Sequence, residues 1–164
     1  MALPITGLWR YNQTDNLDAI SWWASDFDDS GWPSGGGILY VEADPLVSPR
    51  TTPLLLGRTT YYFRGHFGIS FPPTNMVVTF SNRIDDGAVF YLNGRELQRV
   101  RMPAAPQRMQ YTNFATATPP GSDAISADVF MLSEGGLTNL ILGDNLLAVE
   151  VHQNSAHCDV RSLG

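Results

Sequence analysis

The chain has 164 residues and a formal net charge of −6, with ten basic residues, all of them arginine, against 16 acidic ones. Hydrophobic residues make up 43% of the chain, which is enough apolar surface for a packed core and excludes wholesale disorder. Nucleic acid is excluded as a partner because phosphate backbones bind clustered cations. Membrane insertion is excluded because no apolar run reaches the ~20 residues of a spanning helix.

The first clear strand is predicted over 59–70, where apolar and polar residues alternate with a period of two. Tyr61 and Phe63 fall on one face of this strand, and Tyr62 and Arg64 fall on the other. The alternation is typical of a half-buried strand that keeps its second face in solvent.

A β-hairpin is predicted next in the chain. The apolar run 88–92 is followed by Asn93 and Gly94, a pair that favours the positive φ angles of a type I′ turn. Residues 95–102 are therefore predicted to fold back as the partner strand. A further strand is predicted over 76–81, after two prolines.

The last long strand is predicted over 146–153. Leu147 and Val149 lie on the face predicted to be buried, whereas Glu150 and His152 lie on a face predicted to be exposed. This strand is expected to occupy the centre of a sheet.

The remaining residues have little periodicity and are rich in glycine and proline. Long loops are predicted over 34–57, 103–126 and 133–144, a short helix over 134–142, and a short strand over 159–163. Seven or eight short strands with little helix predict an all-β single domain over 1–164, a β-sandwich with jelly-roll topology and long loops.

Four segments resemble, in order and spacing, the galactose-binding-like β-sandwich domains that are appended to many secreted hydrolases. They are FDDSGW (27–32), TTYYFRGHF (59–67), DDGAVFYLNGREL (85–97) and GDNLLAVEVHQ (143–153). A related version forms the sugar-binding jelly roll of the β-galactosidase and β-glucuronidase family. The resemblance extends over 7–163 and implies a Trp-containing first strand and a ligand chosen by the loops.

The location of the protein is predicted from the resemblance and from the first residues. Residues 1–10 lack the charged start and apolar stretch of a secretory signal peptide. A chain that begins at Met1 without a recognisable linker is typical of a complete gene product. We expect the protein in the extracellular space or on a virion surface. The single cysteine, Cys158, excludes a disulfide within the chain.

Two acidic clusters are candidate calcium sites. Adjacent carboxylates at Asp85 and Asp86 are costly to hold together without a positive partner, and Asp28 and Asp29 lie in a turn rich in acidic residues. Ca²⁺ prefers such oxygen ligands. The alternatives are a hairpin-capping turn with Arg83 or Arg64 as counter-ion for the first pair, and a plain Asx-turn for the second. No other cofactor is expected.

No catalytic constellation is predicted. Asp85 and Asp86 point to opposite faces of one strand and cannot flank a glycosidic bond. His152, His157 and Cys158 do not follow a zinc-ligand spacing, and no nucleophile elbow is present. The sequence therefore predicts a protein that is not an enzyme.

Aromatic side chains are the predicted ligand-binding residues, because flat rings stack on the C–H faces of sugars. Trp23 is predicted to project away from a buried Trp22, and Tyr40, Tyr111 and Phe114 lie in or beside the long loops. Two polar residues complete the predicted set of ligand-binding residues: His152 and Asn154.

Two functions remain open on these observations. The first is a non-catalytic carbohydrate-binding or adhesive module that binds a glycan through its loops. The second is a structural subunit of an extracellular or virion assembly, such as a decoration or tail-associated protein, that packs against neighbouring subunits and that could form a homo-oligomer.

Overall fold

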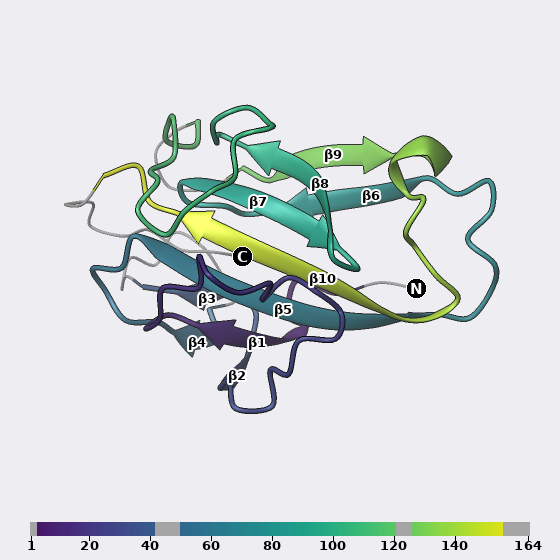
Figure 1. Cartoon of the computed structure of the whole chain (residues 1–164), viewed down its shortest axis with the longest axis horizontal. Coiled ribbons are helices and arrows are strands. Elements are labelled where there is room, and N and C mark those ends of the chain that lie inside the picture. Colours follow the sequence, from purple (N-terminus) through teal and green to yellow (C-terminus); the bar gives the residue numbers. More distant parts are fainter. Residues whose placement is uncertain (1–2, 42–49, 121–125, 156–164) are drawn as a thin grey trace.

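The computed structural model describes residues 3–41, 50–120 and 126–155, and these residues form an all-β structure with a single 3₁₀ turn at Glu134–Gly136 (Figure 1). The strands among the described residues are β1 (Leu8–Asn12), β2 (Ser34–Gly36), β3 (Leu39–Tyr40), β4 (Thr52–Pro53), β5 (Thr60–Ile69), β6 (Val78–Asn82), β7 (Gly87–Leu92), β8 (Arg95–Val100), β9 (Asp128–Leu132) and β10 (Gly143–His152).

The main layer is a six-stranded antiparallel sheet with the order β2-β1-β5-β10-β7-β8. Its two longest strands, β5 and β10, lie side by side from the pair Thr60 and His152 to the pair Ile69 and Gly143. β10 is the last described strand, yet it lies between β5 and β7. Such a non-sequential order requires the crossing connections of a jelly roll.

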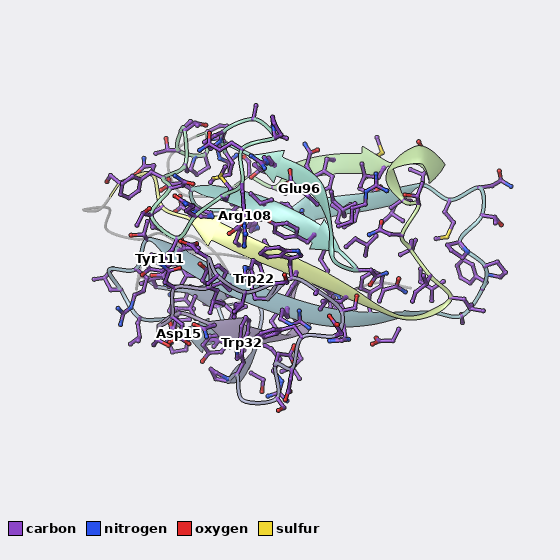
Figure 2. All side chains as sticks on the ribbon, in the orientation of Figure 1. Asp15, Trp22, Trp32, Glu96, Arg108 and Tyr111 are labelled. Atoms are coloured by element: carbon purple, nitrogen blue, oxygen red, sulfur yellow. The ribbon has the colours of Figure 1, made fainter. Side chains whose placement is uncertain are left out.

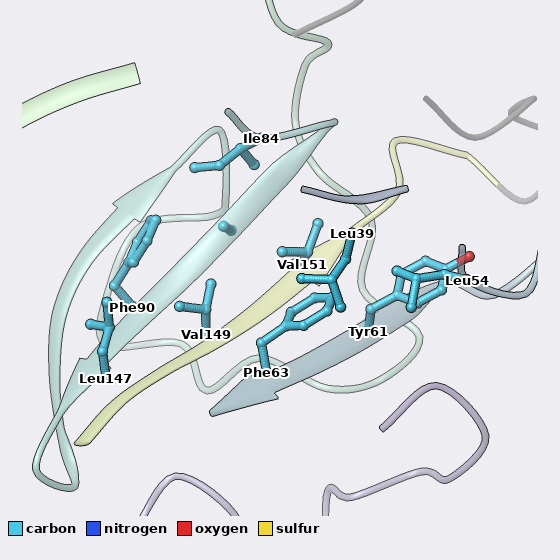
Figure 3. Packing of buried hydrophobic residues seen from close by; sticks show 10 residues of the cluster. Leu39, Leu54, Tyr61, Phe63, Ile84, Phe90, Leu147, Val149 and Val151 are labelled. Carbon is cyan, nitrogen blue, oxygen red and sulfur yellow. The ribbon is translucent and has the colours of Figure 1, made fainter. Parts of the chain in front are cut away.

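One face of this sheet carries the alternating apolar residues that the sequence predicts. Phe63, Phe90 and Val149 come from β5, β7 and β10 and point to the same side (Figure 3). The β6–β9 pair and the short β3–β4 pair cover them, with Phe80 of β6 stacked on Phe130 of β9 at a centroid distance of 4.7 Å. The predicted β-sandwich is therefore confirmed.

The other face of the sheet is also buried, which corrects the expectation of an exposed face. Tyr62 and Arg64 of β5 are each 1% exposed, and Glu150 and His152 of β10 are 4% and 0% exposed. The loop after β1 and the loop after β8 pack against this face. Sequence alternation cannot distinguish solvent from a loop that folds over a strand.

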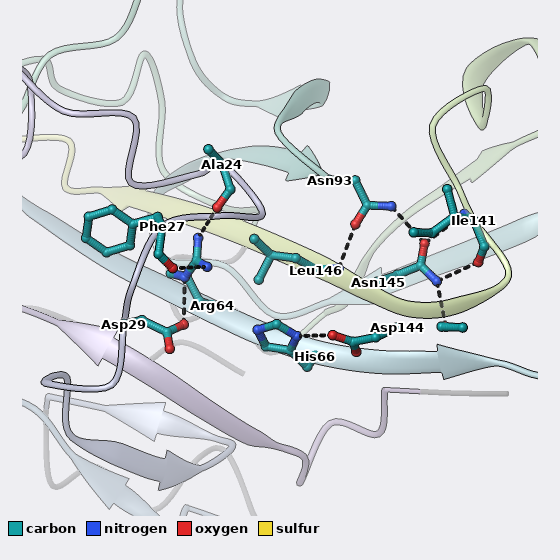
Figure 4. Close-up of polar contacts among 11 residues, drawn as sticks. Ala24, Phe27, Asp29, Arg64, His66, Asn93, Ile141, Asp144, Asn145 and Leu146 are labelled. Carbon is teal, nitrogen blue, oxygen red and sulfur yellow. Dashed lines mark hydrogen bonds and ion pairs between the residues drawn. The ribbon is translucent and has the colours of Figure 1, made fainter.

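The hairpin prediction is confirmed. Asn93 and Gly94 have φ angles of 47° and 87°, and Leu92 pairs with Arg95 on either side of them. The asparagine side chain also joins the turn to β10: Asn93 Oδ1 accepts the N–H of Leu146 at 2.8 Å, and Asn93 Nδ2 donates to Asn145 Oδ1 at 2.8 Å (Figure 4).

Other elements differ from the predictions. β9 received no prediction, because its Val-Phe-Met-Leu run hides the period of two, and the 34–57 loop contains β2, β3 and β4. The helix predicted over 134–142 is reduced to the 3₁₀ turn. The predicted strand 159–163 lies outside the described residues. No helix of the described part is long and apolar enough to span a membrane.

Candidate functional site

The candidate site begins with a buried arginine that holds the aromatic loop onto the sheet. Arg64 Nε pairs with Asp29 Oδ2 at 2.7 Å (Figure 4). Its Nη1 donates to the carbonyls of Trp22 and Ala24 at 2.5 and 2.9 Å, and its Nη2 donates to that of Phe27 at 3.2 Å. One side chain of β5 therefore shapes the segment 22–29. Asp29 uses its carboxylate in this contact.

Trp22 is the centre of an aromatic layer on this face of the sheet. Its ring is 2% exposed and meets Trp23, Tyr62 and Tyr91 edge-on, at centroid distances of 5.8, 4.8 and 5.7 Å. The loop turns between Trp22 and Trp23, so the two rings touch rather than diverge as a strand would direct them. Figure 2 shows this face with Trp22, Trp32, Arg108 and Tyr111 labelled.

Trp23 is half-buried and held in a defined orientation. Its ring stacks on Tyr91, with a centroid distance of 5.4 Å and an interplanar angle of 19°. The guanidinium carbon of Arg108 lies over the same ring, 4.9 Å from its centroid. The Trp23 ring is thus held in a fixed orientation with a cation over it, and it is not an isolated platform.

Asp18 joins the two loops that form this surface. Its carbonyl accepts a hydrogen bond from Arg108 Nη2 at 2.7 Å, and its Oδ1 accepts the N–H of Tyr111 at 2.7 Å. The loop after β1 and the loop after β8 therefore bring Trp23, Arg108 and Tyr111 to one region. We call these three residues the aromatic-arginine surface.

The other predicted aromatic residues are divided between two places. Phe114 is 39% exposed and lies in the same loop as Tyr111. Tyr40 lies in β3, on the layer that covers the opposite face of the sheet, and the guanidinium of Arg50 lies 5.2 Å from its ring centroid. Tyr40 is therefore not part of the aromatic-arginine surface.

His152 lies beneath this surface, in a buried polar chain. His152 Nδ1 lies 2.9 Å from the carbonyl of Asn113 and 3.0 Å from Thr60 Oγ1. Its Nε2 lies 3.3 Å from Oε2 of Glu150, outside hydrogen-bond geometry, while Tyr91 donates to Oε1 of Glu150 at 2.6 Å. Burial, with the nearby Glu150 carboxylate, raises the pKa of Tyr91, so its hydroxyl stays a donor.

Two of the predicted metal ligands, Asp85 and Asp86, lie immediately before β7 and are buried. Asp86 Oδ2 accepts the N–H of Asn154 at 2.7 Å, and the carbonyl of Asp86 accepts Arg101 Nε at 2.6 Å. Arg101 is in turn paired with Asp128, whereas Arg64, one of the predicted counter-ions, pairs with Asp29 instead. Asn154 thus contacts Asp86 through its backbone.

The other acidic cluster is an Asx-turn. Asp28 Oδ1 accepts the N–H of Ser30 at 2.9 Å, and this bond lowers the pKa of Asp28. No group of three or more His, Cys, Asp or Glu side chains in the described ranges could hold a metal ion. Calcium binding at either acidic cluster therefore stays a prediction from the sequence. His157 and Cys158 lie outside the described residues.

Sequence reasoning did not select Arg108, Asp18 or Tyr91. Tyr91 belongs to a strand read as core, and Asp18 and Arg108 are 90 residues apart in the chain. No local pattern marks a carbonyl and a guanidinium that meet across two loops, so only the packed structure reveals this pairing.

The comparisons with known proteins concern the fold. No protein-family model matches the chain, and neither does any curated protein. Among solved structures, the Bacteroides uniformis β-glucuronidase matches 95% of the chain with a TM-score of 0.55 and 18% identity. The Ruminococcus gnavus β-glucuronidase in complex with D-glucuronic acid matches 91% with a TM-score of 0.52 and 12% identity.

The chain spans 15% of the first of these enzymes and 21% of the second. It therefore has the fold of a small part of β-glucuronidases, over nearly its full length. The fold implied by the four sequence segments is confirmed.

Proposed function

We propose that the protein is a non-catalytic carbohydrate-binding module whose ligand lies on the aromatic-arginine surface. The observation that carries the proposal is the fixed Trp23 ring with the exposed Arg108 guanidinium over it. Tyr91 and Arg108 hold the indole, so little side-chain entropy is lost when a sugar contacts it. The exposed Arg108 guanidinium supplies donors for the hydroxyls of that sugar.

The acidic residues support the non-catalytic part of the proposal. Glycoside hydrolysis needs two carboxyl groups that face one bond across roughly 5–10 Å of open space. Glu150, Asp85 and Asp86 are each about 95% buried. Asp29 is occupied by Arg64. None of these four carboxylates is placed to flank a bound glycan.

The test is binding to a glycan array and to insoluble polysaccharides, followed by affinity electrophoresis on the glycans retained. Trp23→Ala and Arg108→Ala are expected to weaken retention at least tenfold. Arg50→Ala is the matched control for Arg108→Ala, because Arg50 also lies over an aromatic ring but on the other layer. Equal retention by Arg108→Ala and Arg50→Ala would place the ligand elsewhere, and retention of no glycan would end the proposal.

A packing role remains the second candidate, and one observation favours it. Val129 and Met131 of β9 are 61% and 69% exposed. Both lie on the outer face of the β6–β9 pair, where apolar exposure is typical of a contact surface. In this function the protein would be a subunit of an extracellular or virion assembly.

The two candidates differ in their dependence on protein concentration. A packing subunit should show oligomers by light scattering as concentration rises, and Met131→Glu should remove them. Thr14→Glu is the control, since Thr14 is exposed in the loop after β1, outside the β6–β9 pair. A monomer at all concentrations, together with glycan retention, leaves the carbohydrate proposal alone.

A further inference from the structure

We propose that Asn93 is a modification site that the folded protein keeps unreactive and that reacts when the hairpin between β7 and β8 opens. The reaction is the spontaneous conversion of Asn93 to aspartate and isoaspartate. Asn93 and Gly94 form the one Asn-Gly pair of the sequence. Because glycine has no Cβ, its backbone nitrogen is the one that an asparagine side chain approaches most easily. The proposal does not depend on which ligand the protein binds.

The reaction needs no reactant other than water. The backbone nitrogen of Gly94 loses its proton and attacks Cγ of Asn93. A bond forms between that nitrogen and Cγ, the bond between Cγ and Nδ2 breaks, and ammonia leaves. Water then opens the five-membered imide. Cleavage of the new bond to Cγ gives aspartate, and cleavage of the original bond to the main-chain carbonyl carbon gives isoaspartate.

The fold holds both ends of the Asn93 side chain away from this attack. Asn93 Nδ2 donates to the carbonyl of Asn139 at 2.7 Å and to Oδ1 of Asn145 at 2.8 Å. Asn93 Oδ1 accepts the N–H of Leu146 at 2.8 Å (Figure 4). An amide group that is fixed at its oxygen and at its nitrogen cannot turn Cγ toward Gly94 unless these hydrogen bonds break.

The backbone of the turn adds a second constraint. Asn93 and Gly94 have φ angles of 47° and 87°, and Leu92 pairs with Arg95 directly across them. The N–H of Asn93 also donates to the carbonyl of Leu146 at 3.0 Å. Ring closure needs the side chain and the next peptide plane to rotate toward each other, and the paired strands oppose that rotation. Opening of the hairpin removes both constraints together.

The products cannot restore these contacts. Aspartate has no side-chain N–H at neutral pH, and its negative charge would face two acceptors, the Asn139 carbonyl and Oδ1 of Asn145. Isoaspartate also adds a methylene to the main chain, inside a turn where Leu92 pairs directly with Arg95. A chain that reacts while it is open therefore loses the turn, and the modification makes the opening irreversible.

The test is incubation of the folded full chain in mildly alkaline buffer. The tryptic peptide 84–95 contains Asn93, so mass spectrometry follows the replacement of its amide NH₂ by OH. The synthetic peptide 84–95 in the same buffer and the full chain in urea are the unfolded references. Conversion is expected to be at least tenfold slower in the folded chain than in either reference. A folded chain that reacts as fast as the references would overturn the proposal.

Intermediate urea concentrations separate opening from any direct effect of urea. The rate of conversion should equal the unfolded fraction, measured by tryptophan emission, multiplied by the rate in full denaturant. This measurement uses the unaltered chain, so it does not depend on how a variant folds. A rate that stays constant across the unfolding transition would contradict protection by the fold.

Asn93→Asp tests the consequence of the reaction, because it creates one of the two products directly. It is expected to lower the melting temperature or to prevent folding. Asn16→Asp is the matched control, since it makes the same change in charge at an exposed position and keeps the acceptor that binds Asp18 N–H. Equal melting temperatures for the two variants would show that the product restores the turn, against the proposal.

Discussion

Arg64 and Asn93 show how single side chains position loops that have no regular structure. Arg64 is 1% exposed and supplies donors to one carboxylate and three carbonyls of the loop above it. Asn93 joins a hairpin turn to β10 and to the loop before it. Both residues belong to the segments that carry the family resemblance. The role that the structure shows for them in these segments is to hold loops in place.

Arg64→Ala should lower the free energy of unfolding by about 3–5 kcal/mol, because it leaves Asp29 and the loop carbonyls without their buried donor. Urea denaturation followed by tryptophan emission measures this change in the free energy of unfolding, since Trp22 lies in the loop that Arg64 holds. Arg95→Ala is the control: Arg95 is exposed and donates to Thr138, and a change within about 0.5 kcal/mol is expected. Equal midpoints for the two variants would show that Arg64 is not the anchor.

The strands show where local patterns suffice. The turn between β7 and β8 depends on two neighbouring residues with positive φ, so Asn-Gly alone predicts it. β6 and the central part of β10 also follow their alternation. β9 does not, because each residue of its core is apolar. β3 and β4 are two-residue strands that exist only because distant segments meet.

Gly94→Ala should cost about 1–2 kcal/mol of stability, because Gly94 has a φ of 87° that an L-residue adopts with strain. Space is not limiting: a Cβ there would have its nearest heavy atom, Ala24 Cα, at 3.7 Å. Gly31→Ala is the matched control, with no atom within 4 Å and no positive φ, and thermal unfolding should leave it unchanged or slightly stabilised. A loss in Gly31→Ala as large as that in Gly94→Ala would refute the conformational explanation.

For the domain as a unit, burial of tyrosines on both faces of the sheet controls its behaviour in alkali. Burial raises the pKa of Tyr61 to about 12, and burial also raises the pKa of Tyr62 and of Tyr91. The unfolded chain loses these protons near pH 10, whereas the folded protein retains them. Their contribution to stability is complete below about pH 10 and is lost as pH rises through the folded pKa values.

The free energy of unfolding should therefore fall above about pH 10 by about 1.4 kcal/mol per pH unit for each of these tyrosines. Urea titrations between about pH 8 and pH 11.5, with phenolate absorbance in parallel, measure this slope. Tyr61→Phe should make the slope shallower by the contribution of one tyrosine, about 1.4 kcal/mol per pH unit. An unchanged slope in that variant would contradict the assignment.

EDTA should leave the melting temperature unchanged, because Asp29 pairs with Arg64, and Asp28 and Asp86 accept backbone N–H groups. Thermal unfolding with EDTA and with added Ca²⁺ checks this. A lower melting temperature in EDTA that Ca²⁺ restores would instead confirm calcium binding.

Local sequence patterns were enough to predict the all-β class, the turn at 93–94 and the buried apolar side of the central strands. They were also enough for the resemblance to a sugar-binding jelly roll. Each of these depends on neighbours a few residues apart. Packing in three dimensions determined that loops cover the second side, that Arg64 meets Asp29 and that Arg108 meets Trp23. Those contacts join residues 35 and more positions apart, and no local periodicity encodes them.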